Sequence, residues 1–314
     1  MDAKLEIAAA EWPHKIDSGY TLSKFLVSSP AFHIVAGVLQ LRDDVAISVV
    51  HDPKIVSDLV VKLPELKPGT DYVILFDNGT LEAWEATDEN FGTDTVVGGF
   101  HYAPGGNATA RAGGDDVPAI NPCSIWDLNF RPTCGDPRGM AYIAGAKVPF
   151  WCDIYLLNVR PWVEGTSRYD MLIADGDDDG LPFKADDQER YDVFDYPTAV
   201  AICAAFGKQL LGPEEFFEAT YGVTEGTSFD ADPERTQLDA PRTSKYGIMQ
   251  ATGNMSTWGG DGDPDGHRRA ARFGGIWVDG GWAGSRRAVV GHWPGVSSEW
   301  IGARGRSDHL QPDA

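Results

Sequence analysis

The sequence predicts an α+β protein that is mostly β and loop, with an N-terminal β-sandwich followed by a second domain. The chain has 314 residues, 42% of them hydrophobic, which is enough to bury one large core or two medium ones. Its 36 glycines and 20 prolines exceed average usage, and only two segments have the pattern of a helix. Many short strands joined by turns explain both observations.

The first part of the chain contains short β-rich runs that are separated by turn residues. These runs are residues 24–27, 33–41, 45–50, 72–76 and 95–100. The pair Asn78-Gly79 is typical of the two-residue turn of a β-hairpin. Residues 103–118 are rich in Gly, Ala and Asp and have almost no large apolar side chain, so we expect a linker or surface loop. We therefore assign residues 1–118 to the β-sandwich domain and its connecting loop.

The second domain is expected to span residues 119–314, where aromatic residues become frequent. Its two helix candidates are 196–206 and 213–221. Gly207 and Gly222 follow them directly, as expected for the left-handed residue that closes a helix. Strands and loops are predicted after the second helix.

Charge and cysteine content exclude several classes of protein. The 26 basic and 47 acidic residues give a formal net charge of -21, which repels nucleic acid and anionic membranes. We expect neither a signal peptide nor a membrane-spanning segment, because the N-terminus has no apolar core and no run of about 18 apolar residues occurs. Cys123, Cys134, Cys152 and Cys203 lack zinc-site spacing. They are interpreted as buried thiols, with a Cys123–Cys134 disulfide as the alternative.

Two acidic loops have the spacing of a calcium-binding loop. In the first, Asp175, Asp177 and Asp179 alternate before Gly180, and Asp186 takes the twelfth position, where a glutamate is usual. These four aspartates are a tentative Ca²⁺ site, and a solvated acidic loop is the alternative. The second loop, 261–266, has an arginine at its twelfth position and is the weaker candidate. No cofactor is required by any other motif.

Motifs of the second domain resemble the C-type lectin fold, as it occurs in formylglycine-generating enzymes and in the variable proteins of diversity-generating retroelements. These motifs are Phe194 to Val200, Gly207 to Leu210, Pro213 to Phe216, Gly253 to Trp258 and Arg272 to Gly275. Within that group, further motifs resemble phage tropism determinants, which bind receptors at the tip of tail fibres. They are Val97 to Gly105, Trp126 to Pro132, Asp136 to Met140, Asp153 to Leu157 and Gly302 to Gly305. The resemblance covers roughly residues 27–310, and we expect the additional N-terminal β-prism of that family to be absent.

The resemblance implies a variable binding face within residues 273–310. If residues 276–283 form a strand, Ile276, Val278 and Trp282 lie on one side and Trp277 on the other. Hydrophobicity alone predicts that the first set is buried, whereas the resemblance implies that it faces solvent. The implied ligand-binding residues are Ile276, Val278, Gly280, Trp282, Val289, Gly291, His292, Val296, Ser298 and Trp300. Exposed aromatic and branched side chains on one face are typical of a protein-binding patch.

The resemblance further implies a homotrimer that binds a protein receptor on a host or target cell without forming a covalent bond. It also implies a place in the virion tail fibre if a phage encodes the chain. Two alternatives stay open. A formylglycine-generating-like oxidase would need a polar pocket with a metal or thiol, and no cysteine follows Cys203, so we do not expect an enzyme. A calcium-dependent carbohydrate lectin is the other alternative.

Overall fold

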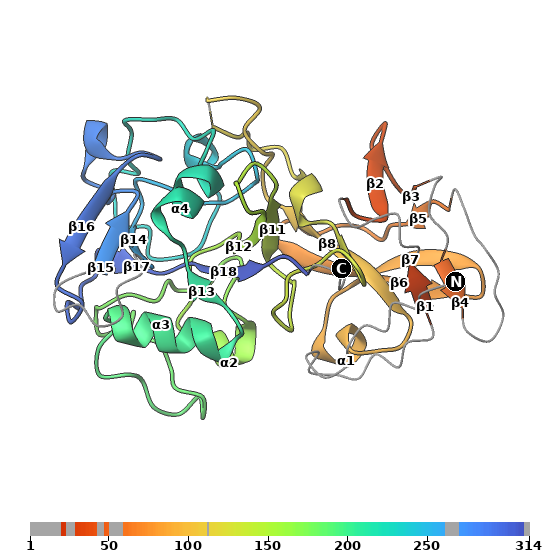
Figure 1. Ribbon diagram of the computed structural model, residues 1–314, viewed down its shortest axis with the longest axis horizontal. Coiled ribbons are helices and arrows are strands. Elements are labelled where there is room, and N and C mark those ends of the chain that lie inside the picture. Colours follow the sequence, from red (N-terminus) through yellow and green to blue (C-terminus); the bar gives the residue numbers. More distant parts are fainter. Residues whose placement is uncertain are drawn as a thin grey trace.

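The computed structural model describes residues 20–22, 29–42, 47–49, 59–111, 113–260 and 270–310. The expected run 24–27 lies outside the described residues. Of the run 45–50, residues 47–49 form strand β4 (Ile47–Val49), which pairs with β1 (Tyr20–Leu22). An N-terminal part and a larger C-terminal part follow each other along the long axis of the molecule (Figure 1).

The N-terminal part is built on a mainly antiparallel sheet with the order β10-β8-β6-β7-β5, and β9 also pairs with β8. Its strands are β5 (Val61–Lys62), β6 (Thr70–Asp77), β7 (Thr80–Glu85), β8 (Val96–Ala103), β9 (Ala119–Ile120) and β10 (Trp126–Asp127), with the short helix α1 (Asp88–Phe91) after β7. Asn78 and Gly79 join β6 to β7 with φ angles of 48° and 81°, which confirms the predicted hairpin. Because β9 and β10 pair with β8, the sheet extends beyond residue 118.

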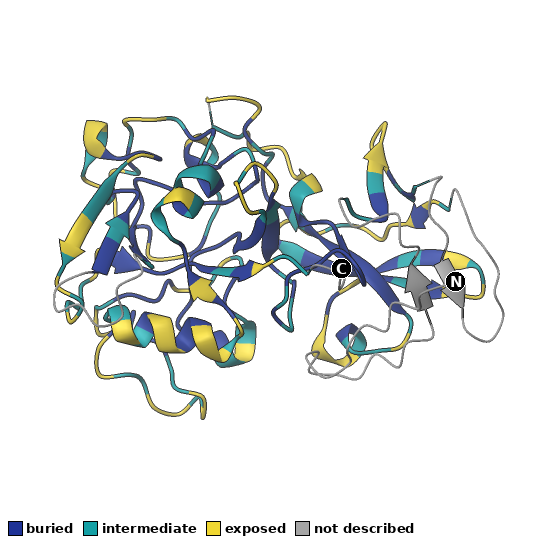
Figure 2. Cartoon of the chain, viewed as in Figure 1, coloured by how far each residue is buried: buried dark blue, intermediate teal, exposed yellow. Residues whose placement is uncertain are grey.

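Both faces of this sheet are covered. On one face, Tyr72 and Ile74 of β6 pack against Phe32 of a hairpin formed by β2 (Phe32–Val35) and β3 (Val38–Leu41). On the other face, Val73 packs in a cluster with Trp151 of the C-terminal part. The alternation of side chains along β6 therefore fixes two cores at once. Figure 2 shows the resulting band of buried residues through the sheet.

Residues 103–118 do not form a free linker. Their backbone is hydrogen-bonded to the C-terminal part, with Ala108 N–H donating to the Ser244 carbonyl (3.1 Å) and Gly113 N–H to the Gly222 carbonyl (2.7 Å). Gly113 has a φ of 78°, and a Cβ there would lie 2.5 Å from the Pro241 carbonyl oxygen. The small residues of this segment thus allow close backbone contact between the two parts.

The C-terminal part contains two four-stranded sheets and two longer helices. Its elements are η2 (Pro122–Ser124), β11 (Met140–Ile143), β12 (Phe150–Asp153), α2 (Pro161–Glu164), α3 (Tyr196–Ala205), β13 (Gln209–Leu210), α4 (Pro213–Ala219), η3 (Ala240–Arg242), β14 (Ser256–Gly259), β15 (Ala270–Phe273), η4 (Gly280–Trp282), β16 (Ala288–His292), β17 (Ile301–Gly302) and β18 (Gly305–Asp308). The sheet orders are β11-β12-β18-β13 and β16-β15-β14-β17. Gly207 follows the C-cap of α3 with a positive φ, as predicted, whereas α4 ends at Ala219 with Thr220 as its C-cap, so Gly222 does not close it. Across the described ranges, no helix is long and apolar enough to span a membrane.

Buried cations hold these sheets together. Lys208 Nζ donates to Asp153 Oδ1 (2.6 Å) and Thr166 Oγ1 (2.7 Å). Burial opposes the charge of Lys208, but the carboxylate of Asp153 raises its pKa above the ordinary value. Arg304 donates to the carbonyl oxygens of Ile154 (2.6 Å) and Met249 (2.7 Å). The buried charges of Lys208 and Arg304 are therefore both satisfied by hydrogen bonds within the domain.

Candidate functional site

The segment between β15 and β16 is a turn followed by the 3-10 helix η4, so the expected strand over residues 276–283 is wrong. Gly274 and Gly275 open the turn with φ angles of 90° and 83°. A Cβ at Gly275 would lie 2.9 Å from the Cα of Ala283. Only glycine fits here, because the backbone is left-handed and the two ends of the segment are in contact.

Backbone hydrogen bonds to a distant loop explain why this segment is not a strand. Asp230 N–H donates to the Trp277 carbonyl (2.9 Å), and Gly226 N–H donates to the Ala283 carbonyl (3.0 Å). Gly280 N–H donates to Ser228 Oγ (3.0 Å). None of these bonds uses the side chain of a residue in 276–283. The path of the segment is therefore set independently of most of its side chains.

The hydrogen-bonded turn buries one tryptophan and exposes another. Trp277 is 8% exposed and packs in a cluster with Met255, against which Ile276 is partly buried. Val278 is 66% exposed and Trp282 is 75% exposed. Hydrophobicity alone would have buried Val278 and Trp282, and the structure places both on the surface. Gly280 is partly exposed.

The expected site residues in β16 differ in exposure. Gly291 is exposed, and its φ of 75° disfavours other residues. Val289 and His292 are half-buried. The His292 ring lies 5.9 Å from the Trp258 ring, and burial together with the nearby charge of Arg272 lowers its pKa. His292 is thus partly a packing residue of the sheet.

The loop from Trp293 to Trp300 returns to the start of β17. Val296 and Ser298 are half-buried in this loop, whereas Trp300 is exposed. Two further side chains, Val290 and Trp293, are exposed but were not among the predicted site residues. Val289 and Val290 are consecutive, and only one of two neighbours in a strand can face the sheet interior. The sequence therefore indicated that one of these two valines is exposed.

The two exposed segments flank the same part of the sheet. Asn254 forms a bridge with Ile276, and Ser256 N–H donates to the Trp300 carbonyl (3.1 Å). The second segment is held by Gly176 N–H, which donates to the Ser298 carbonyl (3.1 Å). Val278 and Trp282 follow β15, Trp300 precedes β17, and Val290 and Trp293 lie in and just after the edge strand β16. We call these five exposed side chains, as a candidate binding surface, the recognition face.

The four aspartates of the tentative calcium loop do not converge. Asp175 is buried and accepts a hydrogen bond from Asp177 N–H (2.8 Å), and burial raises its pKa to about 7. Asp186 instead accepts the N–H of Gln188 (3.0 Å) in an exposed turn. Throughout the described ranges, no three Asp, Glu, His or Cys side chains are grouped to hold a metal ion. Asp179 is exposed, so as arranged this set does not fit the convergent geometry of a calcium loop. The second acidic loop, 261–266, lies outside the described residues.

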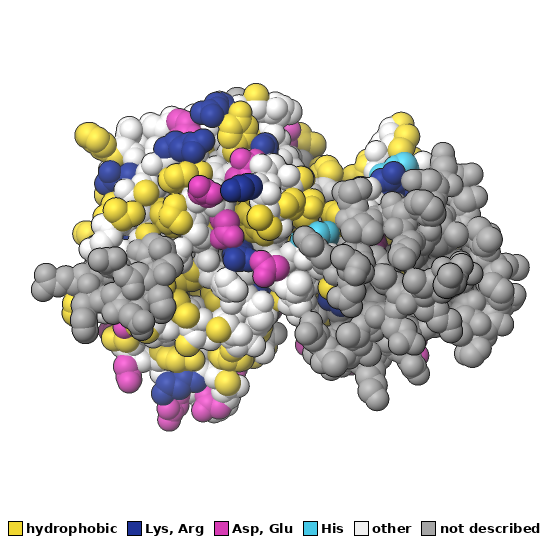
Figure 3. Space-filling view, in the orientation of Figure 1, with side chains coloured by type: hydrophobic (Ala, Val, Ile, Leu, Met, Phe, Trp, Pro, Cys, Tyr) yellow, Lys and Arg dark blue, Asp and Glu magenta, His cyan; other side chains and the backbone are white. Residues whose placement is uncertain are grey.

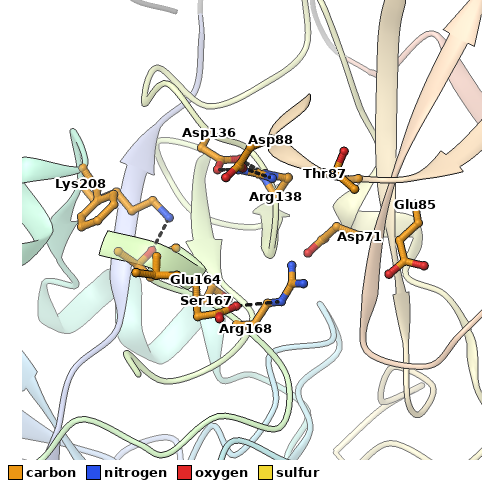
Figure 4. Close-up of a pocket in the computed structure, with 15 residues that line it drawn as sticks. Asp71, Glu85, Thr87, Asp88, Asp136, Arg138, Glu164, Ser167, Arg168 and Lys208 are labelled. Atoms are coloured by element: carbon orange, nitrogen blue, oxygen red, sulfur yellow. Dashed lines mark hydrogen bonds and ion pairs between the residues drawn. The ribbon is translucent and has the colours of Figure 1, made fainter. Parts of the chain in front are cut away.

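A polar pocket of about 280 Å³ lies between the two parts of the molecule (Figure 4). Its charged side chains are paired: Arg138 Nη2 contacts Asp136 Oδ2 (2.7 Å), and Arg138 Nη1 contacts Asp88 Oδ1 (3.1 Å). Asp71 Oδ1 lies 2.9 Å from His101 Nδ1. Burial alone would raise the pKa of Asp71, but the contact with His101 and the N–H of Gly139 hold it below the ordinary value. These pairs connect the N-terminal sheet to the C-terminal part.

None of the four cysteines lines this pocket, although Cys134 Sγ contacts the carbonyl oxygen of the lining residue Asp136 (3.3 Å). All four are free, so the alternative Cys123–Cys134 disulfide is not formed. Cys134, Cys152 and Cys203 are buried, as expected. Burial raises the pKa of Cys152 and of Cys203 to about 12, so both thiols stay protonated at neutral pH. The described lining of the pocket contains no cysteine, which gives thiol chemistry no support here.

Comparison with known proteins gives consistent matches. A family model described as "Mtd second domain" matches residues 24–127. The chain is 37% identical over 292 residues to a tail fiber receptor-binding protein of Bordetella phage BPP-1, covering 81% of this chain and 75% of that protein. The solved I1 variant of the major tropism determinant is 35% identical with a TM-score of 0.83, covering 93% of this chain and 86% of that chain. The P3c variant is 34% identical with a TM-score of 0.84 over the same shares.

Proposed function

The chain belongs to the family of phage major tropism determinants, and from this premise we propose that it is a receptor-binding protein that uses the recognition face to bind a protein on a host cell. Binding is non-covalent, and catalysis has no part in it. In this proposal the protein is a component of the tail fibre of a virion. The face lies in the domain that we predict over residues 119–314, and the predicted β-sandwich domain of residues 1–118 precedes it, with β9 and β10 adding to its sheet beyond residue 118.

This proposal rests on one observation: the groups that position the backbone of residues 276–283 are different from the side chains that this segment exposes. The backbone of the segment that bears Val278 and Trp282 is positioned by hydrogen bonds with the N–H groups of Gly226 and Asp230 and with the Ser228 hydroxyl, and the buried Trp277 packs beneath it. Side chains at the exposed positions can therefore change without changing the backbone. Such a face suits a protein whose binding residues are diversified, and exposed tryptophans are common hot-spot residues of protein interfaces.

Assembly into a homotrimer, as the family resemblance implies, would strengthen this binding. Several copies on one particle turn weak single contacts into avidity, because the second contact is made at a high effective concentration. The net charge of -21 favours solubility and disfavours nucleic acid as the partner.

Cell binding tests the proposal. The fluorescently labelled protein is incubated with a panel of bacterial cells that includes Bordetella, and bound label is measured by flow cytometry. On cells that bind it, Trp282→Ala should lower binding at least about tenfold, because truncating an interface tryptophan removes a typical hot spot. Val200→Ala, at an exposed position of α3, is the matched control and should bind like the wild type.

Two further arms separate the alternatives. Binding that is abolished by a calcium chelator or by free sugars, and is unchanged by Trp282→Ala, would identify a lectin instead of a protein receptor-binding face. Unchanged binding of Trp282→Ala, Val278→Ser and Trp300→Ala together would refute the recognition face itself.

A further inference from the structure

The polar pocket of about 280 Å³ between the two parts of the molecule has the features of a site for a small ligand. The N-terminal part contributes Asp71 and residues 85–88 to its lining, and the C-terminal part contributes Arg138, Lys208 and residues 163–168. At about 30 Å³ per water molecule, this volume holds about nine waters, so a ligand with about that many non-hydrogen atoms would fill it. The described lining includes no side chain of the recognition face, so this is a separate site.

Asp71 presents an unused carboxylate oxygen to the pocket. The residue is only 5% exposed, and its Oδ1 contacts His101 Nδ1 (2.9 Å) and accepts the Gly139 N–H (3.0 Å). Its Oδ2 has no hydrogen-bond or ion-pair partner among the described residues, and Figure 4 shows the carboxylate directed into the pocket. A largely buried anionic oxygen without a donor is unfavourable, and a cationic group in the pocket would satisfy it.

Arg168 presents a free cation to the same pocket. Its Nε lies 3.9 Å from Glu164 Oε2, which is too far for a hydrogen bond, and its guanidinium donates no hydrogen bond to any described residue. Figure 4 shows this guanidinium directed toward Asp71. The two groups face each other without forming an ion pair, so the space between them can hold a molecule that carries both charges.

Other charged side chains around the pocket already have partners. Arg138 is paired with two aspartates, and Lys208 Nζ donates to Asp153 Oδ1 (2.6 Å). Figure 3 likewise shows basic side chains beside acidic ones on the surface of the C-terminal part. Asp71 and Arg168 differ from these groups, because they are opposite charges that face each other and keep hydrogen-bonding capacity for a ligand.

Apolar side chains complete the lining of the pocket. They are those of Ala86, Val163 and Phe206. Val163 is 54% exposed, and the Phe206 ring packs on the ring of Trp162, with 4.9 Å between the ring centroids. An apolar group of a ligand would remove part of this surface from water, which favours binding.

We propose that this pocket binds a small zwitterion, namely an α-amino acid with an aliphatic side chain. The ammonium group of the ligand donates to Asp71 Oδ2, its carboxylate accepts hydrogen bonds from the Arg168 guanidinium, and its side chain contacts Val163 and Phe206. Both polar contacts join opposite charges, which makes them stronger than neutral hydrogen bonds. Because Asp71 belongs to the N-terminal sheet and Arg168 to the C-terminal part, the ligand also links the two parts.

Isothermal titration calorimetry tests the inference with leucine, whose size suits the volume, and with two analogues that each lack one charge. Isoamylamine keeps the ammonium group and the side chain of leucine, and isocaproate keeps the carboxylate and the side chain. Leucine should bind, and each analogue should bind at least about tenfold more weakly, because each loses one charge-assisted contact. Leucine should also raise the thermal unfolding midpoint, since it binds the folded chain.

Matched variants locate the binding site. Arg168→Gln removes the cation at a half-exposed position, so folding should be unchanged, and leucine binding should weaken at least about tenfold. Asp71→Asn keeps an acceptor for His101 and Gly139 but places a donor at the other position, and it should weaken leucine binding in the same way. Arg235→Gln removes an exposed arginine outside the pocket and should bind leucine like the wild type.

Three outcomes would each overturn the inference. They are no binding of leucine by the wild type, equal binding of leucine and both analogues, and full leucine binding by Arg168→Gln. Loss of binding in Arg168→Gln but not in Arg235→Gln would support the site even if Asp71→Asn fails to fold. Cell binding through Trp282 is measured separately, so the proposed function can stand if the pocket proves empty of ligand.

Discussion

The pair Trp277 and Trp282 gives the sharpest test of how the recognition face is built. Trp277 is 8% exposed, and Trp282 is 75% exposed. With about 200 Å² for a tryptophan side chain and about 25 cal/mol per Å², Trp277→Ala should lower the free energy of unfolding by about 4–5 kcal/mol. The same arithmetic gives about 1 kcal/mol or less for Trp282→Ala, because only a quarter of that side chain is covered.

Guanidinium unfolding followed by far-ultraviolet circular dichroism measures both changes. Fluorescence is less suitable, because the chain has ten tryptophans and their signals overlap. Equal losses of stability in Trp277→Ala and Trp282→Ala would refute the separation of framework and exposed side chains. A larger loss in Trp282→Ala would show that Trp282 is a core residue, and the recognition face would then have to be abandoned.

Three further outcomes follow from the buried charges and the turn. Lys208→Met leaves Asp153 unpaired in the interior and should cost about 3–5 kcal/mol in chemical denaturation, whereas the exposed Lys184→Met should cost less than about 1 kcal/mol. Burial raises the pKa of Asp175 from 3.8 to about 7, so its stabilising proton is fully bound below about pH 4 and is lost as the pH rises through about 7. The stability of Asp175→Asn relative to the wild type should therefore rise as the pH goes from about 4 to about 7 and stay level above that, and a difference that does not change with pH would contradict the shift. Gly275→Ala should cost more than about 1 kcal/mol at its positive φ, and an unchanged unfolding midpoint would show that the turn tolerates a side chain.

Local signals in the sequence were reliable where short-range chemistry decides the structure. Asn78-Gly79 can form a type I′ turn whatever surrounds it, so the β6–β7 hairpin was predictable. Gly207 ends α3 for the same local reason, whereas α4 ends at Ala219, three residues before Gly222. By contrast, residues 33–41 look like one strand, and the turn at Ala36 and Gly37 that divides them was missed. Alanine rarely adopts the positive φ of 49° that it has there.

The candidate site was only partly predictable, because contacts from distant residues decide it. The sequence of residues 276–283 is compatible with a strand and with a turn, and either structure could expose alternating side chains. The choice is made by the N–H groups of Gly226 and Asp230, about fifty residues away in the chain, and by the bridge to Asn254. The convergence of Asp175 and Asp186 was likewise suggested by spacing. In the structure, each carboxylate accepts nearby backbone N–H groups instead.

The strand β18 lies between β12 and β13 and follows residues 276–300, which carry the recognition face, in the chain. A polypeptide that terminates early or shifts its reading frame anywhere in 276–300 lacks this strand, and the two strands beside it lose their shared hydrogen-bonding neighbour. Arg304 and its bonds to the domain centre are lost as well. Folding therefore depends on a chain that is translated intact through residues 276–300, because only such a copy assembles the domain that presents the recognition face.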